Sequence, residues 1–440
     1  MTLLEFYRNK SFWFIDKIKG GKVAYYFSLL NKYDNSDISE KEVEEFQNDE
    51  LKRLLCHARE TVPFYQKYDS DVLVDWPVVN KLVIRSNYSA FRSSSYKDDE
   101  LIHMSTSGST GTPFESLQNV EKKKSVNAET LFYNGKTGFR IGRRIIYLRS
   151  VVTETQKSRL QQFAQNIYLL DCTDLSDKGI EEKLNFIKKY SKHCGAMMMG
   201  YSSTLDAFRM YFERNGYEKA KECNLYGVVG GSTMLYDETR KVIENAFGCR
   251  CFSRYANEEN GFLGQDDKEN NVFIMNRVNY ITEVLKFEKD EPTEIGELGR
   301  IVITDLRNYS MPMIRYDTGD VGAWVKVKGS ERLAIGNFGG RSIDMIFNSE
   351  GEAVSPHSIS TAMWKFKNVL QYQFAQIGNN KYEMRLNVVD SFVAENELLH
   401  ELKSIVGQNA NISIKYYDEI PVLASGKRRY IVNEYGANRK

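Results

Sequence analysis

A short segment rich in hydroxyl side chains and glycine offers the clearest chemistry in the sequence. It runs from Thr106 to Pro113 and directly follows a predicted strand at Leu101–Thr106. Hydroxyl groups add hydrogen-bond donors, and two glycines let backbone N–H groups approach an anion closely. The segment could therefore bind a polyphosphate, although it is not the GxxxxGK[ST] loop, because no lysine follows the second glycine. Taken alone, the same composition also suits a mobile surface loop.

Four further segments give this loop its context. They are Tyr255–Glu259 (YANEE), Arg315–Asp320 (RYDTGD), Gly340–Asp344 (GRSID) and Ser425–Lys427 (SGK). In this order and spacing, the five segments resemble the adenylate-forming ligase superfamily, and most of all its phenylacetate–CoA ligase and CapK-like capsule-biosynthesis branch. Flanking matches to that branch are Val62–Tyr65, Trp76–Pro77 with Lys81, Gly296–Arg300 and Gln371–Gln373. The resemblance covers nearly the whole chain.

The resemblance implies a ligand for each matching position. The phosphates of ATP would be held by Thr106, Ser107, Gly108, Ser109, Thr110 and Gly111. Adenine and ribose would be bound by Gly230, Gly231, Ser232, Tyr255, Ala256, Asn257, Asp320 and Arg341. The pocket for the acid would be lined by Tyr133, Tyr201 and Ser202. Asp320 suits the ribose, because one carboxylate can accept two hydrogen bonds at once.

Two residues would carry the catalytic work in such a ligase. Glu259 would hold Mg²⁺, a hard cation that prefers carboxylate and phosphate oxygens. Lys427 would stabilise the negative charge that builds up in the transition state. A carboxylate oxygen attacks the α-phosphorus of ATP, giving an acyl-adenylate and pyrophosphate, and a second nucleophile then attacks the adenylate. Positioning and charge neutralisation dominate this chemistry.

The acceptor of the acyl group stays open. The CapK-like resemblance implies surface-polysaccharide biosynthesis, in which a small carboxylic or amino acid is joined to a sugar amine or hydroxyl. Coenzyme A is the alternative acceptor, as in phenylacetate–CoA ligase. A different class of function is a non-catalytic nucleotide-binding scaffold. Some relatives of the phenylacetate type hold zinc with cysteine and histidine just after the magnesium motif, and residues 265–276 contain neither. We therefore predict ATP and Mg²⁺ as cofactors, and no zinc.

Alternating patterns of apolar residues indicate the elements that must position these residues. Apolar residues at helical spacing predict a helix within 41–60. From about residue 100, predicted strands alternate with helices, such as the strand Ala196–Met199 and the helix Asp237–Phe247. Past residue 270, short β-rich runs include predicted strands at Val272–Met275 and Val321–Lys328. This alternation predicts an α/β fold with a mixed sheet covered by helices. Past residue 340, a segment of about 100 residues mixes helices and strands. We expect a large N-terminal adenylation domain at 1–340 and a small, mobile C-terminal α+β lid domain at 341–440.

Composition narrows the class of protein. The chain has 440 residues, a formal net charge of +1 and 42% hydrophobic residues, which is a globular composition with no basic excess for nucleic acid. Its six cysteines are scattered, which favours reduced thiols and a cytoplasmic protein. No apolar run is long enough to span a membrane. The aromatic, mildly basic start at 1–22 suits either a helix on a membrane surface or a helix packed on its own domain. The oligomeric state cannot be read from the sequence.

Overall fold

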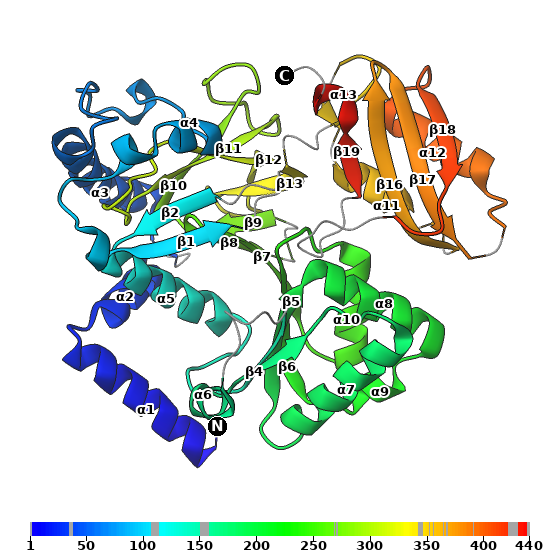
Figure 1. Cartoon of the computed structure of the whole chain (residues 1–440), viewed down its shortest axis with the longest axis horizontal. Helices are drawn as coiled ribbons and strands as arrows, with labels where there is room; N and C mark the ends of the chain where they lie inside the picture. Colours follow the sequence, from blue (N-terminus) through cyan, green and yellow to red (C-terminus); the bar gives the residue numbers. More distant parts are fainter. Residues whose placement is uncertain are drawn as a thin grey trace. The chain divides into compact units, whose positions relative to one another are not determined.

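The chain forms two compact units. The computed structural model describes residues 2–34, 38–106, 114–149, 158–267, 269, 272–341, 346–351, 353–354, 356–363, 365–366, 368–389, 391–420 and 430–437. Unit 1 comprises Met1–Thr282 and Ile303–Tyr316, and unit 2 comprises Glu283–Val302 and Asp317–Lys440. The predicted fold class is confirmed, since a large mixed sheet with covering helices is accompanied by a separate small C-terminal α+β domain (Figure 1). The domain boundary at residue 340 stays a prediction.

Unit 1 begins with helices. They are α1 (Leu3–Ile18), α2 (Lys22–Tyr33), α3 (Glu40–Thr61) and α4 (Lys81–Ser86), with short 3₁₀ turns at Leu73–Asp75 before α4 and at Tyr88–Phe91 and Asp98–Glu100 after it. The side chains of Thr2 and Ser39 cap α1 and α3 and exchange hydrogen bonds with Glu5 and Glu42 three positions later. The apolar spacing at 41–60 correctly predicted α3. Within the described ranges, no helix combines the length and the apolar composition needed to cross a membrane.

A hairpin and a helix follow. Strands β1 (Ile102–Thr106) and β2 (Phe114–Gln118) pair antiparallel, and α5 (Val120–Gly135) comes next. Phe114 and Leu117 of the hairpin are buried in one apolar cluster with Leu54 and Leu55 of α3. The hairpin is therefore fixed to the body of unit 1 by its apolar face.

Five parallel strands form the centre of unit 1. In spatial order they are β4 (Ile167–Asp171), β3 (Ile145–Arg149), β5 (Ala196–Tyr201), β6 (Leu225–Gly231) and β7 (Cys251–Asn257). Strand β8 (Gly261–Asp267) extends the sheet antiparallel to β7, and β9 (Val272–Met275) pairs antiparallel with β8. Short apolar runs in the sequence correctly predicted most of these strands, because strands covered on both faces are apolar throughout.

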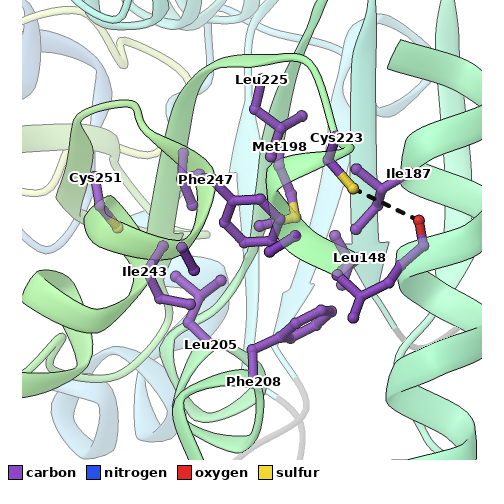
Figure 2. Close-up of a cluster of buried hydrophobic side chains, with 14 of the residues drawn as sticks. Leu148, Ile187, Met198, Leu205, Phe208, Cys223, Leu225, Ile243, Phe247 and Cys251 are labelled. Atoms are coloured by element: carbon purple, nitrogen blue, oxygen red, sulfur yellow. Dashed lines mark hydrogen bonds between the residues drawn. The ribbon is translucent and has the colours of Figure 1, made fainter. Parts of the chain in front are cut away.

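Both faces of the parallel strands are covered. The connecting helices are α6 (Arg159–Gln165), α7 (Asp177–Ser191), α8 (Ser202–Asn215), α9 (Glu218–Lys221) and α10 (Asp237–Phe247). Figure 2 shows one face, where Leu148 and Met198 meet Phe208 of α8 and Phe247 of α10. The thiol of Cys223 lies in the same cluster, with Sγ 3.6 Å from the carbonyl oxygen of Leu184. On the opposite face, the alternate strand residues form a second cluster, Ile145, Met197, Val229 and Phe252, with Leu131 of α5 beside it.

Unit 2 contains two groups of strands. The first is β10 (Tyr280–Leu285), β11 (Leu298–Asp305), β12 (Tyr316–Lys326) and β13 (Leu333–Arg341), three of which begin or end within unit 1. The second is a sheet in the order β18 (Asn411–Tyr416), β17 (Lys381–Val388), β16 (Val369–Gly378), β19 (Ile431–Asn433). Helices α11 (Pro356–Met363), α12 (Glu395–Val406) and α13 (Glu434–Ala437) and the short pair β14 (Ile346–Phe347) and β15 (Ala353–Val354) complete it. Phe374, Met384 and Leu402 are fully buried in the core of this sheet.

All six cysteines are free thiols and all lie in unit 1. Cys172, Cys223 and Cys251 are buried, and Cys56 is exposed on α3. Burial raises the pKa of the thiols of Cys223 and Cys249 to about 12. These thiols are therefore protonated at neutral pH and pack as small apolar side chains.

Candidate active site

Predicted ligand residues meet where parallel strands end. Tyr201, the last residue of β5, is the backbone partner of Gly231, the last residue of β6, and Gly230 pairs with Ser253 of β7. In open α/β sheets, ligands bind outside the carboxyl ends of the strands. The strand order thus brings together Tyr201, Gly231 and the segment that follows β7.

The loop after β6 is held by Ser202. This predicted pocket residue is the first residue of α8, and it is buried. Its hydroxyl donates hydrogen bonds to the carbonyl oxygen of Thr233 at 2.8 Å and to that of Gly231 at 3.4 Å. A Cβ on Gly230 would lie 3.1 Å from the Ser202 hydroxyl, so this position has little room for a side chain. Ser232 has φ +73°, a left-handed conformation that is uncommon for a residue with a side chain.

The magnesium motif forms the end of β7 and the turn to β8. Tyr255 is buried, and its ring meets Phe273 edge to face at 6.3 Å. Ala256 is exposed, and Asn257 accepts a hydrogen bond of 2.7 Å from the backbone N–H of Asn260. The turn is therefore ordered by its own side chains.

The two adjoining carboxylates of this turn differ sharply. Glu258 is exposed, whereas Glu259 is only 2% exposed. Lys81 of α4 forms an ion pair with Oε1 of Glu259, and the hydroxyl of Tyr316 lies 3.4 Å from the same oxygen. The side-chain amide of Gln118 donates to the carbonyl oxygen of Glu259 at 3.1 Å. A buried ionised carboxylate needs such partners, because it has lost its contact with water.

A single buried carboxylate fits the predicted Mg²⁺. This ion is usually held by one or two carboxylates together with the phosphates of the substrate, and not by a complete cage of protein ligands. Glu259 is the residue that would hold it. Among the described residues, no three or more His, Cys, Asp or Glu side chains form a group that could hold a metal ion by themselves.

Lys81 also connects Glu259 to the hairpin whose strands flank the predicted phosphate loop. Its ammonium group lies 5.4 Å from the ring centroid of Phe114, the first residue of β2. Phe114 is the backbone partner of Thr106, the last residue of β1. The predicted residues Ser107, Gly108, Ser109, Thr110 and Gly111 lie outside the described residues, between these two strand ends. Both ends of the predicted phosphate loop are thus placed near the predicted magnesium ligand.

A buried polar network also holds the turn between β7 and β8. The carboxylate of Glu129 on α5 accepts hydrogen bonds from the backbone N–H of Phe262 at 2.9 Å, from Asn279 at 2.7 Å and from the hydroxyl of Tyr280 at 2.9 Å. Lys122 donates to Tyr280 and forms a fully buried ion pair of 2.6 Å with Asp305. Burial raises the pKa of Glu129, although Lys122 and the hydrogen bonds oppose the shift.

Near the predicted acid-pocket residue Tyr133 lies a cation that the sequence did not reveal, Arg254. Tyr133 is fully buried, with its ring stacked on that of Phe262 at 5.0 Å. The guanidinium of Arg254 lies 3.9 Å from the centroid of the Phe262 ring and bonds to the side chain of Asn134. A Cβ on Gly231 would lie 3.8 Å from Cβ of Arg254, so the backbone of this residue adjoins the end of β6. Burial lowers the pKa of Arg254.

The predicted ribose residues Asp320 and Arg341 lie in unit 2. Asp317 accepts a hydrogen bond of 2.8 Å from Gly319 N–H and pairs with Arg300 at 2.8 Å. Gly319 has φ +75°, which turns the chain toward Asp320. Asp320 is half-buried, and its backbone is paired with that of Arg341. The predicted catalytic residue Lys427 lies outside the described residues.

A cavity of about 400 Å³ lies elsewhere in unit 1, lined in part by Lys22, Glu50, Arg53, Glu121 and Arg307. Its charges are paired with one another, as Lys22 with Glu121 at 2.7 Å and Arg53 with Glu50 at 2.6 Å. Arg307 also pairs with Glu50. Because each of these three cations is paired with one of the two carboxylates, this cavity offers less to a charged ligand than the edge of the sheet.

Two residues of the candidate site, Lys81 and Arg254, could not be assigned from the sequence. Lys81 appeared only as a flanking match, since its partner Glu259 is far away along the chain. Arg254 directly precedes the predicted adenine residue Tyr255, and that position is the one local signal that could have pointed to it.

Comparisons with solved structures define the class of fold. 2-Hydroxyisobutyryl-CoA ligase in the postadenylation state matches with a TM-score of 0.71 at 14% identity, over 92% of both chains. ATP-bound MatB from Rhodopseudomonas palustris matches with a TM-score of 0.53 at 14% identity, over 77% of this chain and 68% of MatB. The chain therefore has the fold of the adenylate-forming ligases, as its motifs led us to expect.

Sequence comparisons point to one branch. Residues 346–434 match the family model of the CapK C-terminal domain. The chain is 24% identical to Protein CapK of Staphylococcus aureus over 375 residues, which cover 81% of this chain and 79% of that protein. The resemblance to CapK is thus confirmed, and the chain carries a CapK C-terminal domain.

Proposed function

We propose that this protein is an ATP-dependent ligase that activates a carboxylic acid as an acyl-adenylate. The observation that carries the proposal is the position of Glu259. It is a buried carboxylate in the turn after β7, and Lys81 links it to the strand that follows the hydroxyl- and glycine-rich loop. The adenylate-forming fold and the likeness to CapK support the same reaction.

The residues of this chain have distinct tasks in the proposed first step. The loop 106–111 binds the phosphates of ATP, while Asp320 and Arg341 bind the ribose. Mg²⁺ held at Glu259 would neutralise phosphate charge when bound. The acid lies near Tyr201 and Ser202 with its carboxylate directed at the α-phosphorus. Lys427 stabilises the charge that builds up there, and pyrophosphate leaves as the carboxylate–phosphorus bond forms.

For the second step we propose a sugar amine or hydroxyl as acceptor, in surface-polysaccharide biosynthesis. The likeness to CapK supports this choice. Coenzyme A is the alternative acceptor, because a crystal structure of 2-hydroxyisobutyryl-CoA ligase contains coenzyme A together with the adenylate 2-HIB-AMP.

ATP–pyrophosphate exchange tests the first step independently of the acceptor. The panel should contain small carboxylic acids, amino acids and acids with a second anionic group, since the cation of Arg254 adjoins the predicted pocket. We expect Mg²⁺-dependent exchange with at least one of these acids. ATP binding without exchange for any acid would contradict the proposal and favour a nucleotide-binding scaffold. AMP release that requires coenzyme A would identify the thioester alternative.

Substitution of Lys427 tests the assignment of the catalytic cation. Lys427→Ala should lower exchange by roughly 100-fold or more, because a charge aimed at the transition state is lost, and ATP binding should persist. Arg428→Ala is the matched control, since it removes a charge from the same basic run and should leave exchange within about twofold. Equal effects of the two substitutions in the exchange assay would show that Lys427 is an ordinary surface residue.

A further inference from the structure

Helix α1 is oriented opposite to an ordinary surface helix. Its two acidic residues, Glu5 and Asp16, are 2% and 5% exposed, whereas Leu3, Phe14 and Ile18 are 71%, 65% and 69% exposed. A surface helix of a globular protein normally buries its apolar face and turns its polar face to water. The inverted arrangement calls for a partner on the outer face.

The inner face of α1 is attached by polar contacts and by Phe12 and Trp13, which pack against the apolar cluster of α2. The carboxylate of Asp16 accepts hydrogen bonds from Val23 N–H at 3.2 Å and Ala24 N–H at 3.0 Å, at the start of α2. The side chain of Asn9 donates to the carbonyl oxygen of Ile141 at 3.2 Å. Gly142 has φ +94° and passes so close that a Cβ there would lie 2.2 Å from the carbonyl oxygen of Glu5. These contacts fix which face of the helix points outward.

The outer face carries an apolar stripe. It consists of Leu3, Leu4 and Tyr7 in the first half of the helix and Phe14, Ile15 and Ile18 in the second, with the exposed Ser11 between the two groups. Each of the six apolar side chains is at least 47% exposed. Helix α6 lies beside it, because Arg8 donates from Nε to the carbonyl oxygen of Ala164 at 3.2 Å and from Nη2 to that of Phe163 at 2.5 Å (Figure 1). On α6, Leu160 and Phe163 are 76% and 53% exposed. The two helices thus present apolar side chains together.

Charge identifies the partner. Lys10, Lys17 and Lys19 are exposed along or just past α1, whereas both acidic residues of α1 are turned inward. Apolar side chains flanked by lysine are the pattern of helices that lie in the interface of an anionic bilayer, with the apolar face among the acyl chains and the lysines at the headgroups.

We propose that α1, with α6 beside it, is a docking surface for an anionic lipid bilayer. The helix lies in the plane of the interface and does not cross the bilayer. Phe14 and Ile18 enter the acyl region, and Lys10, Lys17 and Lys19 contact lipid phosphates. The contact is independent of the proposed reaction, which takes place at the edge of the sheet.

Vesicle sedimentation with the full-length protein tests this proposal. Vesicles of phosphatidylcholine with roughly 30% phosphatidylglycerol are compared with vesicles of phosphatidylcholine alone, in about 0.1 M and about 0.5 M salt. We expect binding to the anionic vesicles that weakens in the higher salt. Phe14→Gln/Ile18→Gln should weaken it by about tenfold or more, because two apolar side chains no longer enter the bilayer. Lys10→Gln/Lys17→Gln/Lys19→Gln should abolish the preference for phosphatidylglycerol.

Val72→Gln/Val74→Gln is the matched control, since both valines are more than half exposed at another place in unit 1. It should bind vesicles like the unchanged protein, and circular dichroism should give one melting temperature for all four proteins. Absence of vesicle binding, or equal binding by the Phe14/Ile18 and control variants, would overturn the proposal. A dimer in sedimentation velocity that dissociates only with Phe14→Gln/Ile18→Gln, without vesicle binding, would assign the stripe to a second copy of the chain.

Discussion

At the scale of single residues, the ion pair between Glu259 and Lys81 is the central feature of the candidate site. The carboxylate is nearly inaccessible to water, and the ammonium group of Lys81 forms an ion pair with it. A nucleotide that brings Mg²⁺ to Glu259 would therefore meet a carboxylate that is already held in place.

Removal of Lys81 should destabilise the fold as well as the site. Lys81→Met leaves a buried carboxylate without its cation, and we expect the free energy of unfolding to fall by about 3 kcal/mol. Urea denaturation followed by fluorescence measures this loss. Lys52→Met, on an exposed lysine of α3, should change the free energy by less than about 0.5 kcal/mol.

A double variant separates the ion pair from general damage. Lys81→Met combined with Glu259→Gln removes both charges, so it should be more stable than Lys81→Met alone. Equal or additive losses in the double variant would mean that the two side chains do not interact.

The sequence predicted the residue types of this site better than their partners. Glu258 and Glu259 are neighbours of the same residue type, so the sequence does not show which of them is buried. The folded structure shows that Glu259 is buried and Glu258 is exposed. The pairing of Lys81 with Glu259 joins two distant elements, and no local pattern of residues contains that information. Ser202 was expected to line a pocket, and it also holds the loop after β6 by hydrogen bonds.

At the scale of elements, the turn between β7 and β8 depends on a glycine. Gly261 has φ +113°, and a Cβ there would lie 2.8 Å from Oε2 of Glu129. The buried carboxylate approaches the turn this closely because it accepts the backbone N–H of Phe262. The position of Glu259, two residues earlier, follows from this contact.

Gly261→Ala should therefore be costly. Both the strained backbone and the contact with Glu129 oppose it, and we expect a loss of about 3 kcal/mol in the free energy of unfolding, measured by urea denaturation. Gly296→Ala is the matched control, because Gly296 also has a positive φ, +91°, but nothing lies within 4 Å of the added Cβ. Its loss should be about 1 kcal/mol. Equal losses would show that the contact with Glu129 is unimportant.

Apolar runs and helical spacing predicted the elements themselves well. The strand at 272–275 and the helix at 237–247 agree with β9 and α10 at both ends. Strand β12 starts at Tyr316, five residues earlier than the predicted Val321. The polar segment Asp317–Asp320 was not recognised as part of the strand, because its carboxylates and Gly319 are typical of a turn.

At the scale of the whole molecule, unit 2 has a core and a charge network of its own. Glu383 is flanked by Arg385 and Lys415, each with a nitrogen within 2.6 Å of its carboxylate, and Arg385 also bonds to Glu434 of α13 at 2.8 Å. Burial alone would raise the pKa of Glu383, but the two cations outweigh it and hold the pKa below its usual value of 4.5.

This lowered pKa makes unit 2 sensitive to acid. A carboxylate whose pKa is lower in the folded state contributes stability above its unfolded pKa, and the contribution is lost as pH falls through the folded pKa. In calorimetry we expect two transitions, of which the one from unit 2 moves to lower temperature as pH falls below about 4.5. Glu383→Gln should reduce that movement, and the exposed carboxyl change Glu288→Gln should not. Identical pH profiles for these two variants would contradict the role of the network.

The uneven distribution of thiols between the units has a practical consequence. Cys56 is the exposed thiol, and unit 2 contains no cysteine. Maleimide dyes should therefore couple first at Cys56, although the hydrogen bond to Glu60 raises the pKa of this thiol and slows the coupling. A cysteine introduced at the highly exposed Val393 would add a reporter to unit 2, so that energy transfer between donor and acceptor fluorophores could follow the catalytic cycle in real time.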